Sequence, residues 1–452
     1  MSTSGPAAWS PDGKKLAFAD HDGLFIARGD GTAPGKLATS AEGQITEIIW
    51  APDGTSLRFV PMKPGMLPSG FWEVAIGTGR VTKKDYAWTG GGERFGHWSP
   101  DGKYFLFSRC RVESCSLWAV REDRIRLPWQ TPAPVPLTAD LSSVTDAVPS
   151  LDGKRIYSIS ASTPRAEVWR YEPSIQGFAP DVVMTGISAG HVQYSPDRKW
   201  VAYVTHPESE LWVMRTDGSS KRRLVATPHQ AALPQWSPDG RQIAFMGWEK
   251  GNGHPSHVFL VVLESGAVRQ IPETSYWQGV PVWSSDGNLL IFGENTMQSR
   301  IPESCHLHSF DLRTAVVADL PNTRGLWTPR TNPAGPLVAA LSPDKKKLVL
   351  YNVRTTDRTE LYAFPDGAVF GDNPTWSHDG RSIYFDNPWG RDPAIYRLRL
   401  TDRYFELVAS LKSVNRTHGD VGAWIGLTPD EKVMVLRQLA TSEIYSFDWA
   451  DN

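Results

Sequence analysis

The chain has 452 residues, and its 47 basic and 49 acidic side chains leave a formal net charge of −2. This length allows a large buried core, and the balanced charge provides no positive field, so nucleic acid is not expected as a partner. The sequence holds no run of 18 apolar residues and predicts no membrane-spanning helix. Its 39 glycines and 35 prolines are typical of a protein rich in turns.

One short phrase recurs ten times along the chain. It reads WSPDGKKLAF from Trp9, WSPDGKYFLF from Trp98 and WSPDGRQIAF from Trp236, with looser versions elsewhere. Its aspartates are about 46 residues apart on average, at Asp12, Asp53, Asp101, Asp152, Asp197, Asp239, Asp286, Asp344, Asp379 and Asp430. A repeat of this length with strand-like segments is typical of β-propeller blades.

The chemistry of the phrase predicts a turn between two strands. Proline presets φ, aspartate tolerates tight turn geometry, and glycine accepts a positive φ where the chain re-enters a strand. Short apolar runs after the turn, such as residues 15–18 and 242–245, predict a buried second strand. Most units then show a third strand, at residues 24–26, 117–119, 168–170, 211–213, 361–363, 395–397 and 444–446. A more polar fourth strand is expected at residues 221–225 and 268–271.

These segments predict an all-β fold, a β-propeller of four-stranded antiparallel blades with about eight to ten repeats. Residues 1–452 would form a single repeat domain, as one large ring or as two rings, because a propeller usually has ~4–8 blades. The last unit ends after its third strand, and only residues 1–4 precede the first repeat. A further expectation is therefore that the chain is a fragment of a longer protein, which supplies the closing strand.

The phrase resembles the TolB-like, WD40-like propeller repeat of the Pro-Asp type, and the resemblance covers nearly the whole chain. The segment from Trp424 to Asn452 is similar to the C-terminal blade of bacterial sensor proteins. In that group the propeller follows a kinase or winged-helix output domain and a membrane helix. The resemblance implies a binding or sensor module outside the cytoplasm, in the periplasm, with such an upstream domain as its partner. The repeat itself specifies a fold more than a function.

Ligand sites on propellers favour the channel mouth, where the connections between units converge. Four histidines are expected near this face, His191 and His229 before first strands and His254 and His257 in a long insertion. Such a set suits a divalent ion, and propeller lyases acting on acidic oligosaccharides use histidine-bound metal. No HExxH motif or tight Cys/His cluster is present, so hydrogen-bonding roles are favoured and neither a metal nor a cofactor is predicted.

Aromatic and polar residues in the connections form the second set of candidates. Trp277 and Trp327 lie in inter-unit connections, whereas the tryptophans of the repeat are expected to pack between blades. Arg94, Gln278, Arg324 and Arg330 lie beside such aromatic residues and would suit a carbohydrate or a peptide with carboxylates. The alternative is that these tryptophans cap the blades against water.

Three further patterns have structural interpretations. Residues 186–190 match the nucleophile-elbow string Gly-x-Ser-x-Gly, but the string lacks the strand-turn-helix context that this chemistry requires. Cys110 and Cys115 flank a short connection and could form a disulfide across a hairpin. His308 occupies the aromatic position of a third strand and is expected in the core.

We expect a non-catalytic binding, sensor or scaffold module that recognises a protein, peptide or glycan at the channel mouth, with no catalytic residue assigned. One alternative is a metal-assisted lyase or hydrolase for acidic oligosaccharides, built on the four histidines. The other is the gating propeller of a serine peptidase, whose catalytic domain would follow Asn452.

Overall fold

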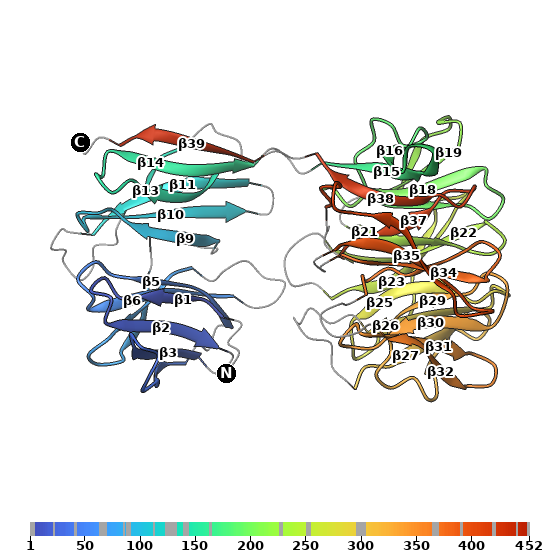
Figure 1. Ribbon diagram of the computed structural model, residues 1–452, viewed down its shortest axis with the longest axis horizontal. Coiled ribbons are helices and arrows are strands. Elements are labelled where there is room, and N and C mark those ends of the chain that lie inside the picture. The colour runs from blue at the N-terminus through green and yellow to red at the C-terminus, as the bar shows by residue number, and fades with distance from the viewer. Residues whose placement is uncertain are drawn as a thin grey trace. The chain divides into compact units, whose positions relative to one another are not determined.

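The chain folds almost entirely into β-strands that form two compact units. The computed structural model describes residues 5–20, 23–39, 43–62, 70–84, 86, 92–111, 114–122, 133–138, 144–161, 165–225, 229–249, 255–294, 304–363, 370–388, 392–417, 422–439 and 442–449. Unit 1 comprises Met1–Thr163, Gly251–Gly253 and Ala440–Asn452, and unit 2 comprises Pro164–Lys250 and His254–Leu439 (Figure 1). The described residues form ten antiparallel sheets, nine of four strands and one of three. This confirms the predicted all-β propeller architecture.

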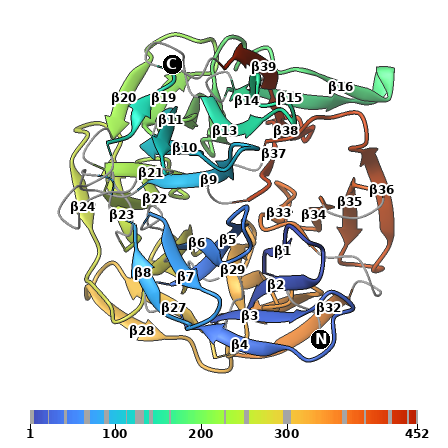
Figure 2. The same ribbon diagram turned by 90° about the vertical axis from the view of Figure 1, so that its left-hand side faces the viewer.

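Unit 1 holds four of these sheets (Figure 2). The first contains β1 (Ala7–Trp9), β2 (Lys15–Asp20), β3 (Gly23–Arg28) and β4 (Gly35–Ala38). The second contains β5 (Gln44–Trp50), β6 (Ser56–Met62), β7 (Trp72–Ala75) and β8 (Val81–Lys83). The third contains β9 (Glu93–Trp98), β10 (Tyr104–Arg111), β11 (Ser114–Arg121) and β12 (Val135–Pro136). The fourth contains β13 (Val144–Pro149), β14 (Arg155–Ala161) and β39 (Ser442–Asp448).

Unit 2 holds six four-stranded sheets. Five follow chain order: β17 (Ala189–Tyr194), β18 (Trp200–Thr205), β19 (Leu211–Arg215) and β20 (Arg222–Val225); β21 (His229–Trp236), β22 (Gln242–Glu249), β23 (His257–Val262) and β24 (Val268–Gln270); β25 (Gln278–Trp283), β26 (Leu289–Glu294), β27 (Leu307–Asp311) and β28 (Val316–Asp319); β29 (Trp327–Thr331), β30 (Leu337–Leu341), β31 (Lys347–Asn352) and β32 (Arg358–Ala363); β33 (Thr375–Trp376), β34 (Ser382–Asn387), β35 (Ala394–Arg399) and β36 (Phe405–Ser410). The sixth pairs β37 (Ile425–Leu427) and β38 (Val433–Gln438) with β15 (Ala166–Glu172) and β16 (Gly177–Pro180), which flank the 3₁₀ turn η1 (Pro173–Ile175).

Unit 2 is closed into a ring by strands from its two ends. The first strands contact one another in turn around the circle: β17, β21, β25, β29, β33, β37 and again β17. The closing sheet takes its two inner strands from the end of the unit and its two outer strands from the beginning. Side chains from both ends share its core, since Val168 and Leu436 are cross-strand partners and both are buried. A six-bladed ring lies within the usual range for propellers.

Two third strands pair with a different hairpin from the one that precedes them in the sequence. The sequence predicts residues 168–170 as the third strand of the unit that begins with β13 and β14, and residues 444–446 as the third strand after β37 and β38. Both strands are present, but β15 pairs with β38 and β39 pairs with β14. In sequence, unit 2 thus lies between the second and third strands of the last sheet of unit 1. The repeat pattern alone does not distinguish these pairings, because either third strand matches either hairpin.

The Ser-Pro-Asp-Gly turn is held by a local network that repeats along the chain. In the turn at Ser237, the hydroxyl donates to Asp239 Oδ1 at 2.6 Å, and that oxygen accepts the backbone N–H of Arg241 at 3.0 Å. The Ser237 oxygen in turn accepts the backbone N–H of Gln242 at 2.9 Å. These hydrogen bonds lower the pKa of Asp239. The phrase therefore persists because its serine and aspartate close the hairpin between the first and second strands.

One of the ten phrases has a different position in its blade. Residues 341–347, which contain Ser342 and Asp344, join the second strand β30 to the third strand β31. The first turn of this sheet is instead built on Asn332, whose Oδ1 accepts the backbone N–H of Ala334 at 2.8 Å. Residues 361–363, predicted as a third strand, consequently lie in the fourth strand β32. This shift explains why the repeat spacing is uneven around Asp344.

Four of the six repeat tryptophans pack between blades, as predicted, and make the same hydrogen bond. The indole Nε1 atoms donate to a carbonyl oxygen on the first strand of the preceding sheet: Trp50 to Ala8, Trp236 to Gln193, Trp283 to Gln235 and Trp376 to Arg330, at 2.9–3.1 Å. These four side chains are 5–7% exposed. Trp9 occupies the same position in the first sheet of unit 1, and it is 56% exposed. The anchor is therefore buried by the preceding blade.

The predictions for the cysteine pair and for His308 are also confirmed. Cys110 and Cys115 form a disulfide between the paired strands β10 and β11. His308 is buried on β27, where its ring stacks on Tyr276 with centroids 4.1 Å apart and its Nδ1 lies 2.8 Å from Asp319. In the part of the chain that the structure describes, no helix is long and apolar enough to cross a membrane.

Candidate functional site: the channel of unit 2

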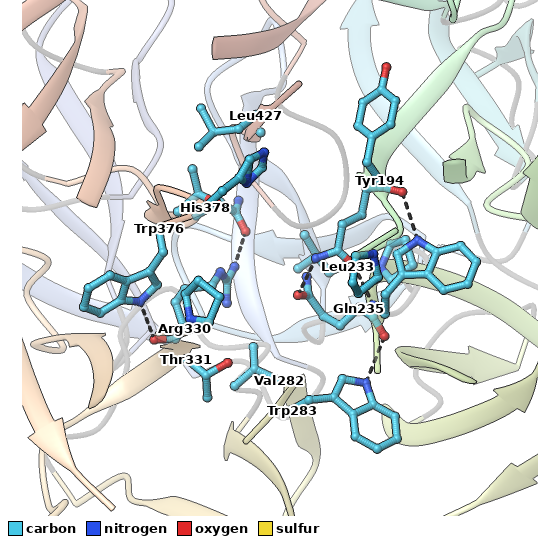
Figure 3. A pocket seen from close by; sticks show the side chains of 18 of the residues that line it. Tyr194, Leu233, Gln235, Val282, Trp283, Arg330, Thr331, Trp376, His378 and Leu427 are labelled. Atoms are coloured by element: carbon cyan, nitrogen blue, oxygen red, sulfur yellow. Dashed lines mark hydrogen bonds between the residues drawn. The ribbon is translucent and has the colours of Figure 1, made fainter. Parts of the chain in front are cut away.

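A cavity of about 480 Å³ occupies the channel of unit 2. Side chains from all six first strands, or from the turns that follow them, face it (Figure 3). Its lining includes His191 on a first strand and also four prolines of the turns that follow the first strands: Pro196, Pro238, Pro333 and Pro429. The cavity therefore includes the turn side of the ring, whereas the sequence favoured the opposite mouth, where the connections meet.

The charge of this lining is one-sided. The described lining residues include the arginines Arg198 and Arg330 and the histidines His191 and His378, but no aspartate or glutamate. A concave surface lined by one sign of charge, with low-dielectric walls, concentrates ligands of the opposite sign. The channel of unit 2 is thus suited to an anionic ligand.

Arg330 is the buried cation of this site. It lies on β29 and is only 9% exposed. Its Nη1 donates to the carbonyl oxygen of Pro329 at 2.8 Å, and its Nη2 donates to Asn373 Oδ1 at 2.6 Å. Burial lowers the pKa of Arg330 to about 10, so the guanidinium remains protonated at neutral pH.

No carboxylate lies within salt-bridge distance of Arg330 among the described residues, and its two hydrogen bonds go to neutral oxygens. A guanidinium has five N–H donors, so this cation retains donors for a further acceptor. Asp372, which forms an ion pair with Lys345, also attracts the Arg330 charge from beyond salt-bridge distance and offsets part of the effect of burial. The remaining donors of Arg330 are therefore available to an acceptor in the cavity.

Asn373 holds the guanidinium in place from the neighbouring sheet. Its side-chain oxygen accepts from Arg330, and its Nδ2 donates to the carbonyl oxygen of Ala423 at 2.8 Å. Asn373 is itself buried, so its amide spans three consecutive blades without access to bulk water. The orientation of the arginine is therefore fixed before any ligand arrives, which lowers the entropic cost of binding.

His191 is the second buried polar group of the lining. It lies on β17 and is 7% exposed, and its Nδ1 has no hydrogen-bond partner among the described residues. Burial, together with repulsion from His206 and Arg330, lowers the pKa of His191 to about 3. The ring is consequently neutral at physiological pH and offers one donor and one acceptor to a ligand.

Two of the other predicted histidines lie together, but away from the cavity lining. His229 on β21 and His257 on β23 both approach Phe259, with ring centroids 5.2 and 6.5 Å away. The Nδ1 atom of each is buried and has no partner among the described residues. His254 lies outside the described residues. No group of three or more His, Cys, Asp or Glu side chains that could hold a metal ion is present in the described ranges.

The predicted residues of the connections are used in different ways. Gln278 is fully buried, where its Oε1 accepts the backbone N–H of Val258 at 2.7 Å and its Nε2 donates to the carbonyl oxygen of Pro272 at 2.8 Å. Its amide thus ties the start of β25 to the connection and to β23 of the preceding blade. Trp277 is half-buried beside it.

Arg324 and Trp327 lie near Arg330 in sequence but outside the cavity lining. Arg324 is exposed, and its carbonyl oxygen accepts from Arg358 at 3.1 Å. The indole of Trp327 donates to the carbonyl oxygen of Ser342 at 3.1 Å, and Lys345 lies over the ring at 5.3 Å. Arg94 belongs to unit 1, where its guanidinium lies 4.7 Å from the Phe95 ring. Of the ten predicted site residues, the cavity brings together His191 and Arg330.

Several lining residues were not predicted. Gln193 and Gln235, each directly before a repeat anchor, are joined by a 2.9 Å hydrogen bond between their side chains. Asn373 stands three positions before the anchor Trp376. The first strands of a propeller line its channel. The polar residues just before each anchor were therefore the sequence signal that could have identified these lining residues.

The serine of the Gly-x-Ser-x-Gly string has a structural role. The Ser188 hydroxyl donates to the carbonyl oxygen of His206 at 2.6 Å and accepts the backbone N–H of Ala166 at 3.0 Å. These bonds connect β15 to the connection that precedes β17. This agrees with the structural interpretation of the string.

Comparison with known proteins gives short and distant matches. No family model matches the chain. The chain is 26% identical over 119 residues to an uncharacterized peptidase, YuxL of Bacillus subtilis, which is 25% of this chain and 18% of that protein. It is 33% identical over 87 residues to the Tol-Pal system protein TolB of Anaeromyxobacter dehalogenans, which is 19% of this chain and 20% of TolB. The chain therefore spans only about a fifth of the length of these curated relatives.

Solved structures with a similar fold include TolB from Acinetobacter baumannii, at 13% identity and a TM-score of 0.39, covering 79% of this chain and 82% of TolB. They also include an oligogalacturonate lyase from Vibrio parahaemolyticus, at 12% identity and a TM-score of 0.42, covering 88% of this chain and 98% of the lyase. The ten antiparallel sheets of the described residues, with hairpins closed by the Ser-Pro-Asp-Gly phrase, define a β-propeller protein. The matching stretches make these repeats similar to those of TolB proteins, at distant identity and over a small part of the chain.

Proposed function

We propose that this protein is a non-catalytic binding module whose unit 2 takes a carboxylate-bearing segment of a protein or peptide into its channel. The observation that carries the proposal is the buried guanidinium of Arg330, which has no carboxylate within salt-bridge distance among the described residues and stands in a lining without acidic side chains. A carboxylate accepts two parallel hydrogen bonds from a guanidinium, which gives both charge neutralisation and orientation. The neutral ring of His191 adds a polar group on the same lining.

Two further features support a peptide. The lining offers tryptophan and proline surfaces together with the Gln235 amide and the Thr331 hydroxyl, which suit the alternation of apolar and amide groups in an extended chain. The family resemblance to sensor propellers also favours recognition over catalysis, and it favours a location outside the cytoplasm with an output domain upstream.

The experiment is a titration of the whole chain with an acetylated, amidated hexaglutamate peptide, with the hexaglutamine peptide as the neutral control. Binding is read by calorimetry and by the shift in thermal midpoint, because a ligand that binds only the folded state stabilises it. We expect saturable binding of the acidic peptide, and a loss of at least tenfold in affinity in Arg330→Met. Arg324→Ala is the matched control, since Arg324 is exposed and lies outside the lining.

The same titration tests the other ligand classes. If oligogalacturonate binds and both peptides fail, the ligand is a glycan and the peptide assignment is wrong. If an ultraviolet-absorbing unsaturated product forms from a polyuronate with added Mn²⁺, the module is catalytic and the proposal is overturned. If Arg330→Met and Arg324→Ala bind alike, the channel is not the site.

A further inference from the structure

The fourth sheet of unit 1 differs from the nine others because it has three strands in the described residues. Its third strand, β39, pairs with β14 through one edge and is the outermost strand of the sheet (Figure 1). Six of the seven residues of β39 are exposed, and Ile444 is 78% exposed. Third strands elsewhere are largely buried, as in β19, where Leu211, Val213 and Met214 are buried. A long exposed edge strand is a template for the addition of another strand.

The other sheets show what a fourth strand contributes. In the sheet of β19 and β20, Arg223 stands directly opposite Trp212. Its guanidinium lies 5.9 Å from the indole and forms a 2.9 Å ion pair with Glu210. Glu210 is two residues before the tryptophan and accepts its indole N–H at 3.1 Å. The acidic residue and the ring thus form one receptor for an arginine on the neighbouring strand.

The same receptor occurs in the closing sheet of unit 2. Glu167 accepts the indole N–H of Trp169 at 2.6 Å, again two residues apart. Arg437 of the adjacent strand β38 is the cross-strand partner of Glu167 and lies 4.2 Å from the indole. The covering arginine lies on the fourth strand in one sheet and on the second strand in the other, so a Glu-x-Trp pair on a third strand accepts an arginine from either neighbouring strand.

Strand β39 carries this receptor without the arginine. Glu443 is two residues before Tyr445 and accepts its hydroxyl at 2.7 Å. Tyr445 stands opposite Ser158, the position that Trp212 occupies opposite Tyr203 on β18. No cation covers the Tyr445 ring within the described residues, and the side chain is 41% exposed.

The charge of the strand favours the same kind of occupant. Its residues Ser442–Asp448 include two acidic side chains and no basic one. Asp448 has Arg155 at 3.6 Å, but both side chains are exposed, and such a pair contributes little. An added strand therefore meets a negative edge and an apolar contact at Ile444.

We propose that β39 accepts an extended segment of a partner polypeptide as the fourth strand of this sheet, with an arginine of that segment over Tyr445 and paired with Glu443. Main-chain hydrogen bonds to the free edge hold the segment, and the arginine fixes its register. This surface lies within unit 1 and is independent of the channel of unit 2.

The probe is the acetylated, amidated and fluorescently labelled peptide SSKRRLVA, which copies residues 219–226 and so the fourth strand beside β19. Anisotropy measures its affinity for the whole chain. We expect saturable binding that weakens about two- to fivefold in Tyr445→Ala and in Glu443→Gln, the effect of one exposed cation–π contact or ion pair. Replacing the peptide's second arginine by citrulline, which has the same shape without the charge, should weaken binding similarly.

Three controls keep the proposal falsifiable. Tyr157→Ala removes a tyrosine of nearly equal exposure, 40%, from the opposite face of the same sheet, and should leave the affinity unchanged. A peptide with N-methyl groups on alternate residues loses its strand edge and should not bind. Arg330→Met should bind the probe normally, which separates this surface from the channel. The proposal is overturned if the native peptide does not bind, or if the citrulline and Tyr445→Ala substitutions leave its affinity unchanged.

Discussion

The indole of Trp376 donates its hydrogen bond to the backbone carbonyl oxygen of Arg330 at 2.9 Å. This bond connects the repeat anchor of one blade to the channel cation of the preceding one. The repeat thus does more than close turns, because its tryptophan also fixes the backbone that carries a candidate binding residue.

Trp376→Phe should reduce the stability of unit 2. The substitution keeps most of the aromatic packing but leaves the Arg330 carbonyl oxygen without its donor inside the core, at a cost of about 1–3 kcal/mol. Denaturant unfolding of the whole chain measures the loss. Trp9→Phe is the matched control at the same repeat position, where the side chain is 56% exposed, and it should change stability much less. Equal losses would show that the inter-blade hydrogen bond is not what stabilises the anchor.

The repeat phrase predicts the architecture well because its physical cause is local. Serine, aspartate and glycine close a hairpin within a few residues, so each phrase reports a blade. It is less informative at Asp344, where the same turn chemistry joins the second strand to the third. It also does not determine the partners of β15 and β39, since strand pairing across more than 200 residues depends on packing that no local phrase encodes.

The candidate site shows a similar division. Arg330 and His191 stand near first strands, and the sequence identifies both. The sequence does not identify Asn373, because its role depends on a contact with Arg330 across a sheet boundary, 43 residues away in sequence. Gln278 carries the residue type expected of a ligand contact, but its amide bonds the preceding blade at Val258 and the connection at Pro272. The sequence predicts the type of residue and its approximate location, whereas the direction of each side chain depends on the register of strand pairing.

His191 should make the stability of the protein depend on pH. Its pKa is lowered to about 3 in the folded state, so the unfolded chain binds a proton at this residue below its ordinary value of 6.5 while the folded chain does not. Stability from this residue is therefore full above pH 6.5 and falls as the pH decreases toward 3, by ~1.4 kcal/mol per pH unit. Unfolding midpoints between pH 7 and 4 measure the slope.

The matched variants assign this slope to one residue. His191→Gln should flatten the acid dependence by most of that amount, whereas His306→Gln, at a half-exposed ring, should leave it in place. An unchanged slope in His191→Gln would contradict the buried neutral state of this histidine.

Arg58 should be essential for unit 1. Its guanidinium is buried and bonds Glu73 at 3.1 Å, Glu122 at 2.8 Å and the Tyr86 hydroxyl at 3.1 Å. Arg58→Met leaves two carboxylates without their cation, and breaking such a network costs about 3–5 kcal/mol. Denaturant unfolding of unit 1 reads the loss, and Arg80→Met, at an exposed position of the same unit, should have little effect. A loss below 1 kcal/mol in Arg58→Met would mean that the apolar side chain replaces the network, as happens for some buried ion pairs.

Arg198 occupies a turn position that favours glycine. Three of the repeat turns carry a larger residue where the phrase has glycine, and all three adopt a positive φ: Arg198 at 61°, Lys345 at 57° and Glu431 at 62°. The left-handed conformation costs a residue with a side chain about 1–2 kcal/mol, and a glycine at the position removes this cost. Part of the resulting stabilisation is lost because glycine gives the unfolded chain more conformational entropy. Arg198→Gly should therefore stabilise unit 2 by about 0.5–1 kcal/mol.

Arg198 is the suitable test of the three because the other two side chains have partners that a glycine would remove. Lys345 pairs with Asp372, and Glu431 accepts the backbone N–H of His378. The reverse substitution at an equivalent turn is the control: Gly240 has a φ of 69° and only Pro196 within 4 Å of an added Cβ, so Gly240→Ala strains the backbone without a clash and should destabilise by about 1 kcal/mol. If Arg198→Gly destabilises the protein instead, the contacts of the arginine side chain in the channel wall must stabilise the protein by more than the backbone strain costs. In that case the affinity of the Arg198→Gly variant for the acidic peptide should also fall.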